Sequence, residues 1–138
     1  MREVNEIIIH CTATRADQHV TLADINRWHR ERGFAKIGYH YVIDRDGRIL
    51  TGRDEREVGA HCEGRNANSI GIAYIGGLCP STGKNADTRT KKQKEALEYL
   101  IISICMRLNI AQIVGHSEYT KKDCPCFDAA NEYYLLIP

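Results

Sequence analysis

Glu6-Ile7-Ile8-Ile9-His10 predicts a buried strand close to the start of the chain. Three consecutive β-branched apolar residues favour a strand whose side chains are covered by the rest of the fold. The residues that follow, 11–20, are mostly polar and predict a loop, so we expect the strand to end at His10. His10 would then be held by a rigid strand at the edge of a sheet.

Strand and helix patterns alternate along the rest of the chain. An Asp46-Gly47 pair predicts a hairpin turn, and segment 76–88, rich in Gly, Pro, Ser and Asn, predicts an exposed loop. Two helices are expected to begin at capping boxes, Thr21 with Asp24 and Thr90 with Gln93. The expected strands are 39–43, 48–52, 69–75 and 110–115, and the expected helices are 22–32, 90–109 and 127–136. This order predicts one α/β domain, residues 1–138, with a central mixed β-sheet flanked by helices in two or three layers.

The composition is that of a folded globular protein. The 138 residues suit one domain, and 43% of them are hydrophobic. The formal net charge is +1 and the charges are scattered, which argues against a nucleic-acid partner. The short basic cluster of residues 89–94 is interpreted as the solvated face of a helix.

The N-terminal segment and the cysteines bear on where the protein is made. The apolar run 7–9 is too short for the core of a signal peptide or for a membrane span. We therefore expect a soluble protein that is cytoplasmic as synthesised and does not insert into membranes. Thiols or metal ligands are then more plausible than disulfides. The six cysteines are Cys11, Cys62, Cys79, Cys105, Cys124 and Cys126.

Segment Val114 to Pro125 contains the strongest chemical signal. His116 follows the expected strand 110–115, and Lys122 and Cys124 lie on the loop after it. Imidazole nitrogen and thiolate sulfur are ligands that zinc prefers. His10, His116 and Cys124 would supply three protein ligands and leave one zinc position open, as in catalytic zinc sites. Taken singly, each of these residues is more often an ordinary histidine or a buried thiol, but His10, His116 and Cys124 together, with Lys122 on the same loop, favour a metal site. Cys126 is an alternative ligand, but a Cys-Pro-Cys chelate is short, which favours Cys124.

Several short motifs together resemble a known family. They are Ile8-Ile9-His10-Cys11-Thr12-Ala13-Thr14, Asp24-Ile25-Asn26-Arg27-Trp28-His29, Gly38-Tyr39-His40-Tyr41-Val42-Ile43, Asp46-Gly47, Gly59-Ala60-His61, Asn68-Ser69-Ile70-Gly71-Ile72 and Gly115-His116 through Cys124-Pro125-Cys126-Phe127-Asp128. In this order they resemble the zinc-dependent N-acetylmuramoyl-L-alanine amidases of the type 2 family. That family includes small bacteriophage lysozymes of amidase type and the animal peptidoglycan recognition proteins.

The resemblance implies a site and a substrate. It implies Zn²⁺ on His10, His116 and Cys124, with catalytic support from Tyr39 and Lys122. It also implies hydrolysis of the peptidoglycan amide that joins the lactyl group of N-acetylmuramic acid to L-alanine. The residues expected to contact the substrate are Thr12, His61, Arg65 and Asn66. The alternative for His61, Arg65 and Asn66 is an ordinary surface or loop position.

Two kinds of function are compatible with these residues. The first is an amidase, a phage or prophage endolysin or a bacterial autolysin, that reaches the wall through a membrane lesion. The second is a peptidoglycan-binding module that does not cut, with an added role as inhibitor of another protein. The presence of Cys124 and Lys122 favours the amidase. We expect a monomer whose partner is peptidoglycan.

Overall fold

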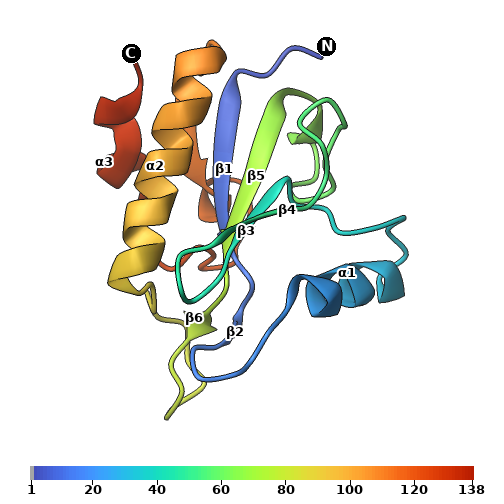
Figure 1. Cartoon of the computed structure of the whole chain (residues 1–138), viewed down its shortest axis with the longest axis vertical. Coiled ribbons are helices and arrows are strands. Elements are labelled where there is room, and N and C mark those ends of the chain that lie inside the picture. Colours follow the sequence, from blue (N-terminus) through green and yellow to red (C-terminus); the bar gives the residue numbers. More distant parts are fainter. Residues whose placement is uncertain (1) are drawn as a thin grey trace.

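The computed structural model describes residues 2–138 and is built on one mixed sheet (Figure 1). The five strands of this sheet lie in the order β4-β3-β5-β1-β7. They are β1 (Glu6–Cys11), β3 (Tyr41–Ile43), β4 (Ile49–Thr51), β5 (Ser69–Tyr74) and β7 (Gln112–Gly115). β1 is parallel to β5 and β7, β3 is parallel to β5, and β4 is antiparallel to β3. The expected α/β fold with a central mixed sheet is confirmed.

Helices cover the sheet on both sides. In Figure 1, α2 (Lys91–Arg107) and α3 (Ala129–Tyr133) lie on one side of the sheet, and α1 (Leu22–Glu31) lies on the other. Both α1 and α2 begin at the expected capping boxes, in which the N-cap threonine accepts a hydrogen bond from the third helical residue. Within residues 2–138, no helix combines the length and apolar character that crossing a bilayer requires.

The side chains of strand β1 point alternately to the core under α2 and to the side of α1. Because successive side chains of a strand point to opposite faces, Ile7, Ile9 and Cys11 join the core under α2. Glu6 and His10 therefore point to the side of α1, and both are buried, with 2% and 1% of their surface exposed. This alternation places His10 at the carboxyl end of a central strand, on the face where the cleft lies.

Several predicted boundaries are wrong in informative ways. The loops 11–20 and 76–88 contain a second, two-stranded sheet, β2 (Thr14–Arg15) with β6 (Gly77–Leu78). Two-residue strands are too short for a periodic pattern, and these two continue the parallel course of β1 and β5. The helix expected at 127–136 is divided into α3 and a 3₁₀ turn, Tyr134–Leu136. Strand β3 begins at residue 41, so Tyr39 precedes it.

The buried face of α2 packs against the sheet and contributes to the stability of the fold. Leu97 is fully buried against the sheet, whereas Tyr99 on the same helix is 69% exposed. We expect Leu97→Ala to lower the free energy of unfolding by about 2–5 kcal/mol, because it removes apolar contacts and leaves a cavity. Tyr99→Ala is the matched control and should change it by less than about 0.5 kcal/mol. Urea unfolding measures both, and equal losses would contradict this assignment of the core.

Candidate metal centre

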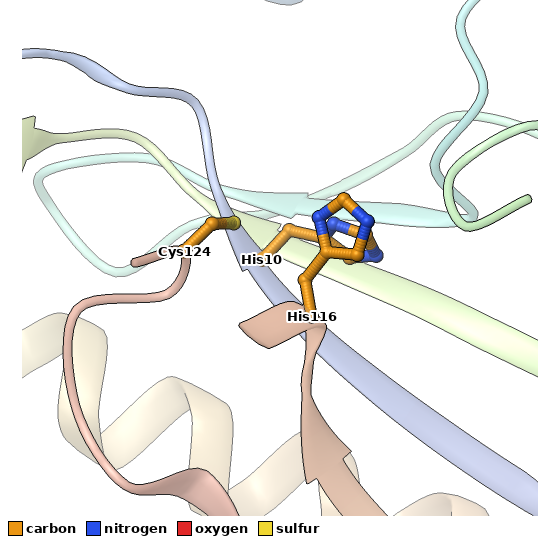
Figure 2. A group of neighbouring side chains, drawn as sticks. All are labelled: His10, His116 and Cys124. Carbon is orange, nitrogen blue, oxygen red and sulfur yellow. The ribbon is translucent and has the colours of Figure 1, made fainter. Parts of the chain in front are cut away.

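Three potential metal donors converge from three segments of the chain. His10 is the penultimate residue of β1, His116 follows β7, and Cys124 lies on the loop that leads to α3 (Figure 2). Because β1 and β7 are adjacent and parallel, their carboxyl ends meet at one edge of the sheet. One donor atom from each residue lies within 4.8 Å of the other two. No other such group, including one with Cys126, occurs among the described residues 2–138.

The orientation of His10 is fixed by a second histidine. Nε2 of His10 and Nδ1 of His61 share a hydrogen bond of 2.9 Å, and Nε2 of His61 is 3.2 Å from Ser69 Oγ. This pairing leaves Nδ1 of His10 as the ring nitrogen available to a metal. Metal-binding histidines commonly have their other nitrogen bonded in this way. Gly71 makes room for the His61 ring, since a Cβ there would lie 2.5 Å from His61 Cγ.

The environment holds the donors in the protonation states that bind metals. Burial, followed by the proximity of His61 and His116, lowers the pKa of His10 well below its usual value. Burial and then the Lys122 ammonium lower the pKa of His116. A hydrogen bond from the Cys11 side chain is the main cause that lowers the pKa of Cys124, and the Cys11 backbone N–H also donates to its Sγ at 3.1 Å. The two imidazoles are therefore neutral, and the thiolate form of Cys124 is favoured, as metal binding requires.

The donor set fits a zinc ion. Two neutral imidazoles and one thiolate are the nitrogen and sulfur ligands that zinc takes, and three protein donors leave a fourth tetrahedral position open. The convergence of these atoms at the mouth of a cleft, rather than in a closed core, suits a catalytic site.

The three donors lie in a cleft of about 510 Å³. The other residues that line it are Cys11, Thr12, Ala13, His29, Arg32, Phe34, Tyr39, Ala60, His61, Cys62, Glu63, Asn66, Thr120 and Lys122. The structure therefore brings eight of the nine proposed site residues to one hollow. His29 was not among the nine proposed site residues. Its Nδ1 accepts the Gly38 N–H at 2.8 Å, and its ring also reaches the cleft.

Tyr39 and Lys122 line the cleft beside the donors. The Tyr39 ring centroid lies 5.1 Å from that of His10. Burial raises the pKa of Tyr39, so its hydroxyl stays protonated and can donate a hydrogen bond. Lys122 is exposed at the cleft, two residues before Cys124. These positions offer a neutral hydrogen-bond donor and a cation beside the three donors.

The four residues expected to contact substrate differ in position. Thr12 Oγ1 accepts the Gly76 N–H at 3.0 Å, and Asn66 Oδ1 accepts the N–H groups of His61 and Cys62 at 3.0 and 2.9 Å. Both residues therefore stabilise the backbone of the cleft through these hydrogen bonds. Arg65 is not among the cleft residues. Its guanidinium forms an ion pair with Glu6, 3.2 Å away.

Acid should destabilise the metal-free protein through its buried histidines. Burial lowers the pKa of His29 to about 4 and that of His61 to about 3. Below the unfolded value of about 6.5, the unfolded chain binds protons that the folded chain excludes, so stability falls as pH decreases, by up to about 1.4 kcal/mol per pH unit for each histidine. Urea unfolding with a chelator at pH 7, 6 and 5 measures this slope.

His29→Asn supplies the control for that slope. The amide oxygen keeps an acceptor for the Gly38 N–H but does not titrate, so the pH dependence should be shallower. A stability that stays constant between pH 7 and 5 would contradict the prediction, because the carboxylates titrate mainly below this range.

Comparisons with known proteins agree with this geometry. The chain matches the Amidase_2 family, N-acetylmuramoyl-L-alanine amidase, over residues 1–127. The endolysin of Escherichia phage T7 is 39% identical over 122 residues, which cover 88% of this chain and 80% of the endolysin. Peptidoglycan-recognition protein SC2 of Drosophila melanogaster is 31% identical over 134 residues, 91% of this chain and 70% of that protein.

A solved structure has the same fold. The N-acetylmuramoyl-L-alanine amidase LysC from Clostridium intestinale superposes with a TM-score of 0.81 at 30% identity, covering 95% of this chain and 82% of LysC. The family match runs through Cys124, so it includes the three donors, Tyr39 and Lys122. The resemblance inferred from the sequence motifs is confirmed, and the chain belongs to the N-acetylmuramoyl-L-alanine amidases of the type 2 superfamily, which also contains the peptidoglycan recognition proteins.

Proposed function

We propose that the protein is a zinc-dependent peptidoglycan amidase that cleaves the bond between the lactyl group of N-acetylmuramic acid and L-alanine. The observation that carries the proposal is the convergence of His10, His116 and Cys124 within 4.8 Å at a cleft. The names of the relatives, an endolysin and an N-acetylmuramoyl-L-alanine amidase, support the substrate and the bond.

The residues of the site divide the work. When bound, zinc supplies Lewis-acid polarisation of a carbonyl and brings the pKa of water in its open position to about 7. His10, His116 and Cys124 hold the ion, and His61 keeps the His10 ring in place through its 2.9 Å hydrogen bond. The cleft of about 510 Å³ is large enough for a sugar and the first residues of a stem peptide.

Lys122 and Tyr39 act on the reacting groups. The Lys122 ammonium stabilises negative charge that builds on the scissile carbonyl oxygen as the amide is attacked. The Tyr39 hydroxyl, which stays protonated, orients the attacking water or relays its proton. We assign proton handling to these two side chains, because both line the cleft beside the donors.

A second candidate function is recognition of peptidoglycan without cleavage. The similarity to peptidoglycan-recognition protein SC2 favours it. Cys124 in donor position argues for hydrolysis, because it completes a group of three donors that would leave one position of a zinc ion open. We further propose that the protein works as a monomer on the bacterial wall, as expected for an endolysin.

The experiment that separates the two functions combines metal analysis with wall digestion. Purified protein should contain about one zinc per chain, clear a suspension of sacculi and release peptides with a new N-terminal L-alanine. A chelator should stop clearing, and added zinc should restore it. Binding to sacculi without release of peptides would support recognition and reject the amidase.

A further inference from the structure

Glu6 is a buried carboxylate that the proposed mechanism does not use. It begins β1 on the same face as His10, and 2% of its surface is exposed. Arg65 Nη2 lies 3.2 Å from its Oε1, while Gln112 Nε2 and the Tyr119 hydroxyl donate to its Oε2. A buried carboxylate is tolerated only with such partners, and removing one of them is costly.

Two of the three partners of Glu6, Arg65 and Tyr119, belong to segments that line the cleft, and the third, Gln112, lies on β7. Arg65 lies on the loop between His61 and Asn66. Tyr119 follows the 3₁₀ turn that starts at His116. The Arg65 guanidinium also lies over the Tyr119 ring, 4.5 Å from its centroid, so the two segments touch each other directly. One carboxylate therefore joins both walls.

We infer that Glu6, Arg65 and Tyr119 form a clasp that fixes the segment carrying Lys122 relative to the loop carrying His61. The inference rests on the proposed amidase function and deepens it. Arg65 is then a positioning residue, and its effect on turnover passes through Tyr119 rather than through contact with the substrate.

The anchoring of residues 117–123 explains why the clasp matters for Lys122. The two ends of the segment are joined, because the Ser117 N–H donates to the Cys124 carbonyl at 2.7 Å. Cys124 Sγ in turn accepts a hydrogen bond from the Cys11 N–H. Tyr119 anchors the middle of the segment, and the exposed Lys122 lies between it and Asp123, whose carboxylate accepts a hydrogen bond from Asn85 Nδ2 at 2.9 Å. Releasing Tyr119 frees the ammonium to move while leaving the metal donors held. A displacement of about 1 Å can lower a rate about 100-fold.

A double-mutant cycle tests the clasp. With zinc bound, Arg65→Gln and Tyr119→Phe should each lower kcat roughly 5- to 50-fold through misplacement of Lys122, with KM within about twofold. The double variant should be no slower than the slower single variant, because both break the same clasp. Arg48→Gln is the matched control, since Arg48 pairs with Asp44 on an exposed hairpin and its side chain is 71% exposed. It should leave kcat and KM unchanged.

Substrate contact by Arg65 predicts a different pattern and would overturn the inference. Arg65→Gln would then raise KM, and Tyr119→Phe would leave both kcat and KM unchanged. Arg65→Lys, which keeps the positive charge, would have the kcat of the wild type. Zinc affinity, measured by competition with a chelator, should stay within about twofold of wild type in the clasp variants, because His10 and Cys124 keep their own partners.

Hydrogen exchange of the zinc-loaded protein gives a readout independent of turnover. Amides 119–123 should exchange at least about tenfold faster in Tyr119→Phe, the milder variant that keeps the Arg65–Glu6 pair, and unchanged in Arg48→Gln. Unchanged exchange in Tyr119→Phe would overturn the clasp even if wild-type protein is an active amidase. Conversely, wild-type protein that exchanges as expected but cleaves no sacculi would reject the amidase and leave the clasp supported.

Discussion

Replacing Cys124 with serine should reduce amidase turnover about 1,000-fold or more and strongly weaken zinc binding. The change removes the only sulfur donor of the three-residue group. A hydroxyl does not ionise at neutral pH and is a poor zinc ligand compared with thiolate. Loss of the ion removes several kcal/mol of transition-state stabilisation, and about 4 kcal/mol corresponds to a 1,000-fold change in rate. Zinc content after dialysis and release of peptides from sacculi measure the two effects.

Cys126→Ser is the matched control for the same loop. Cys126 lies two residues further on, packs against the core, and its thiol faces the Gly77 carbonyl at 3.5 Å. Serine is nearly the same size and can keep that hydrogen bond, so zinc content and turnover should stay close to wild type. If Cys126→Ser loses zinc while Cys124→Ser retains it, the assignment of the donor sulfur is wrong.

Strand ends explain why the convergence of His10 and His116 could be predicted from the sequence. The apolar run before His10 and the run before His116 each predict a strand, and β1 and β7 are adjacent and parallel. His10 lies at the carboxyl end of β1 and His116 directly after β7, so the two histidines meet at one edge of the sheet. Cys124 carries no such periodic signal, since it lies on an irregular loop. It was assigned from its donor chemistry and from the family resemblance.

Residues whose role depends on loops could not be predicted in the same way. Arg65 was expected either to contact substrate or to lie on a solvated loop, and nothing in its local sequence indicates its carboxylate partner, Glu6, which lies 59 residues away. His29 shows the same limit, because helical spacing indicates which side it faces but not that the cleft reaches it. Long-range pairs between an irregular loop and a strand leave no periodic trace in the chain.

Lys122→Ala should lower kcat about 100- to 1,000-fold, the usual effect of removing one donor that stabilises a developing oxyanion. Lys122 lines the cleft near His116, on which its charge acts. The side chain is exposed, so folding stability should change by less than about 0.5 kcal/mol. Zinc affinity should not fall, because a neighbouring cation opposes the binding of a second one. Steady-state kinetics on soluble muropeptides and chelator competition measure these effects separately.

Lys121→Ala tests whether position or merely positive charge is responsible. Lys121 is the adjacent residue, is also exposed, and does not line the cleft. A general attraction between a basic loop and the anionic wall would make both variants weaker on intact sacculi, especially at low salt. Stabilisation of the reacting carbonyl affects Lys122→Ala alone, and does so equally on small muropeptides at high salt. Equal kcat values for Lys122→Ala and wild type on such fragments would remove Lys122 from the catalytic site.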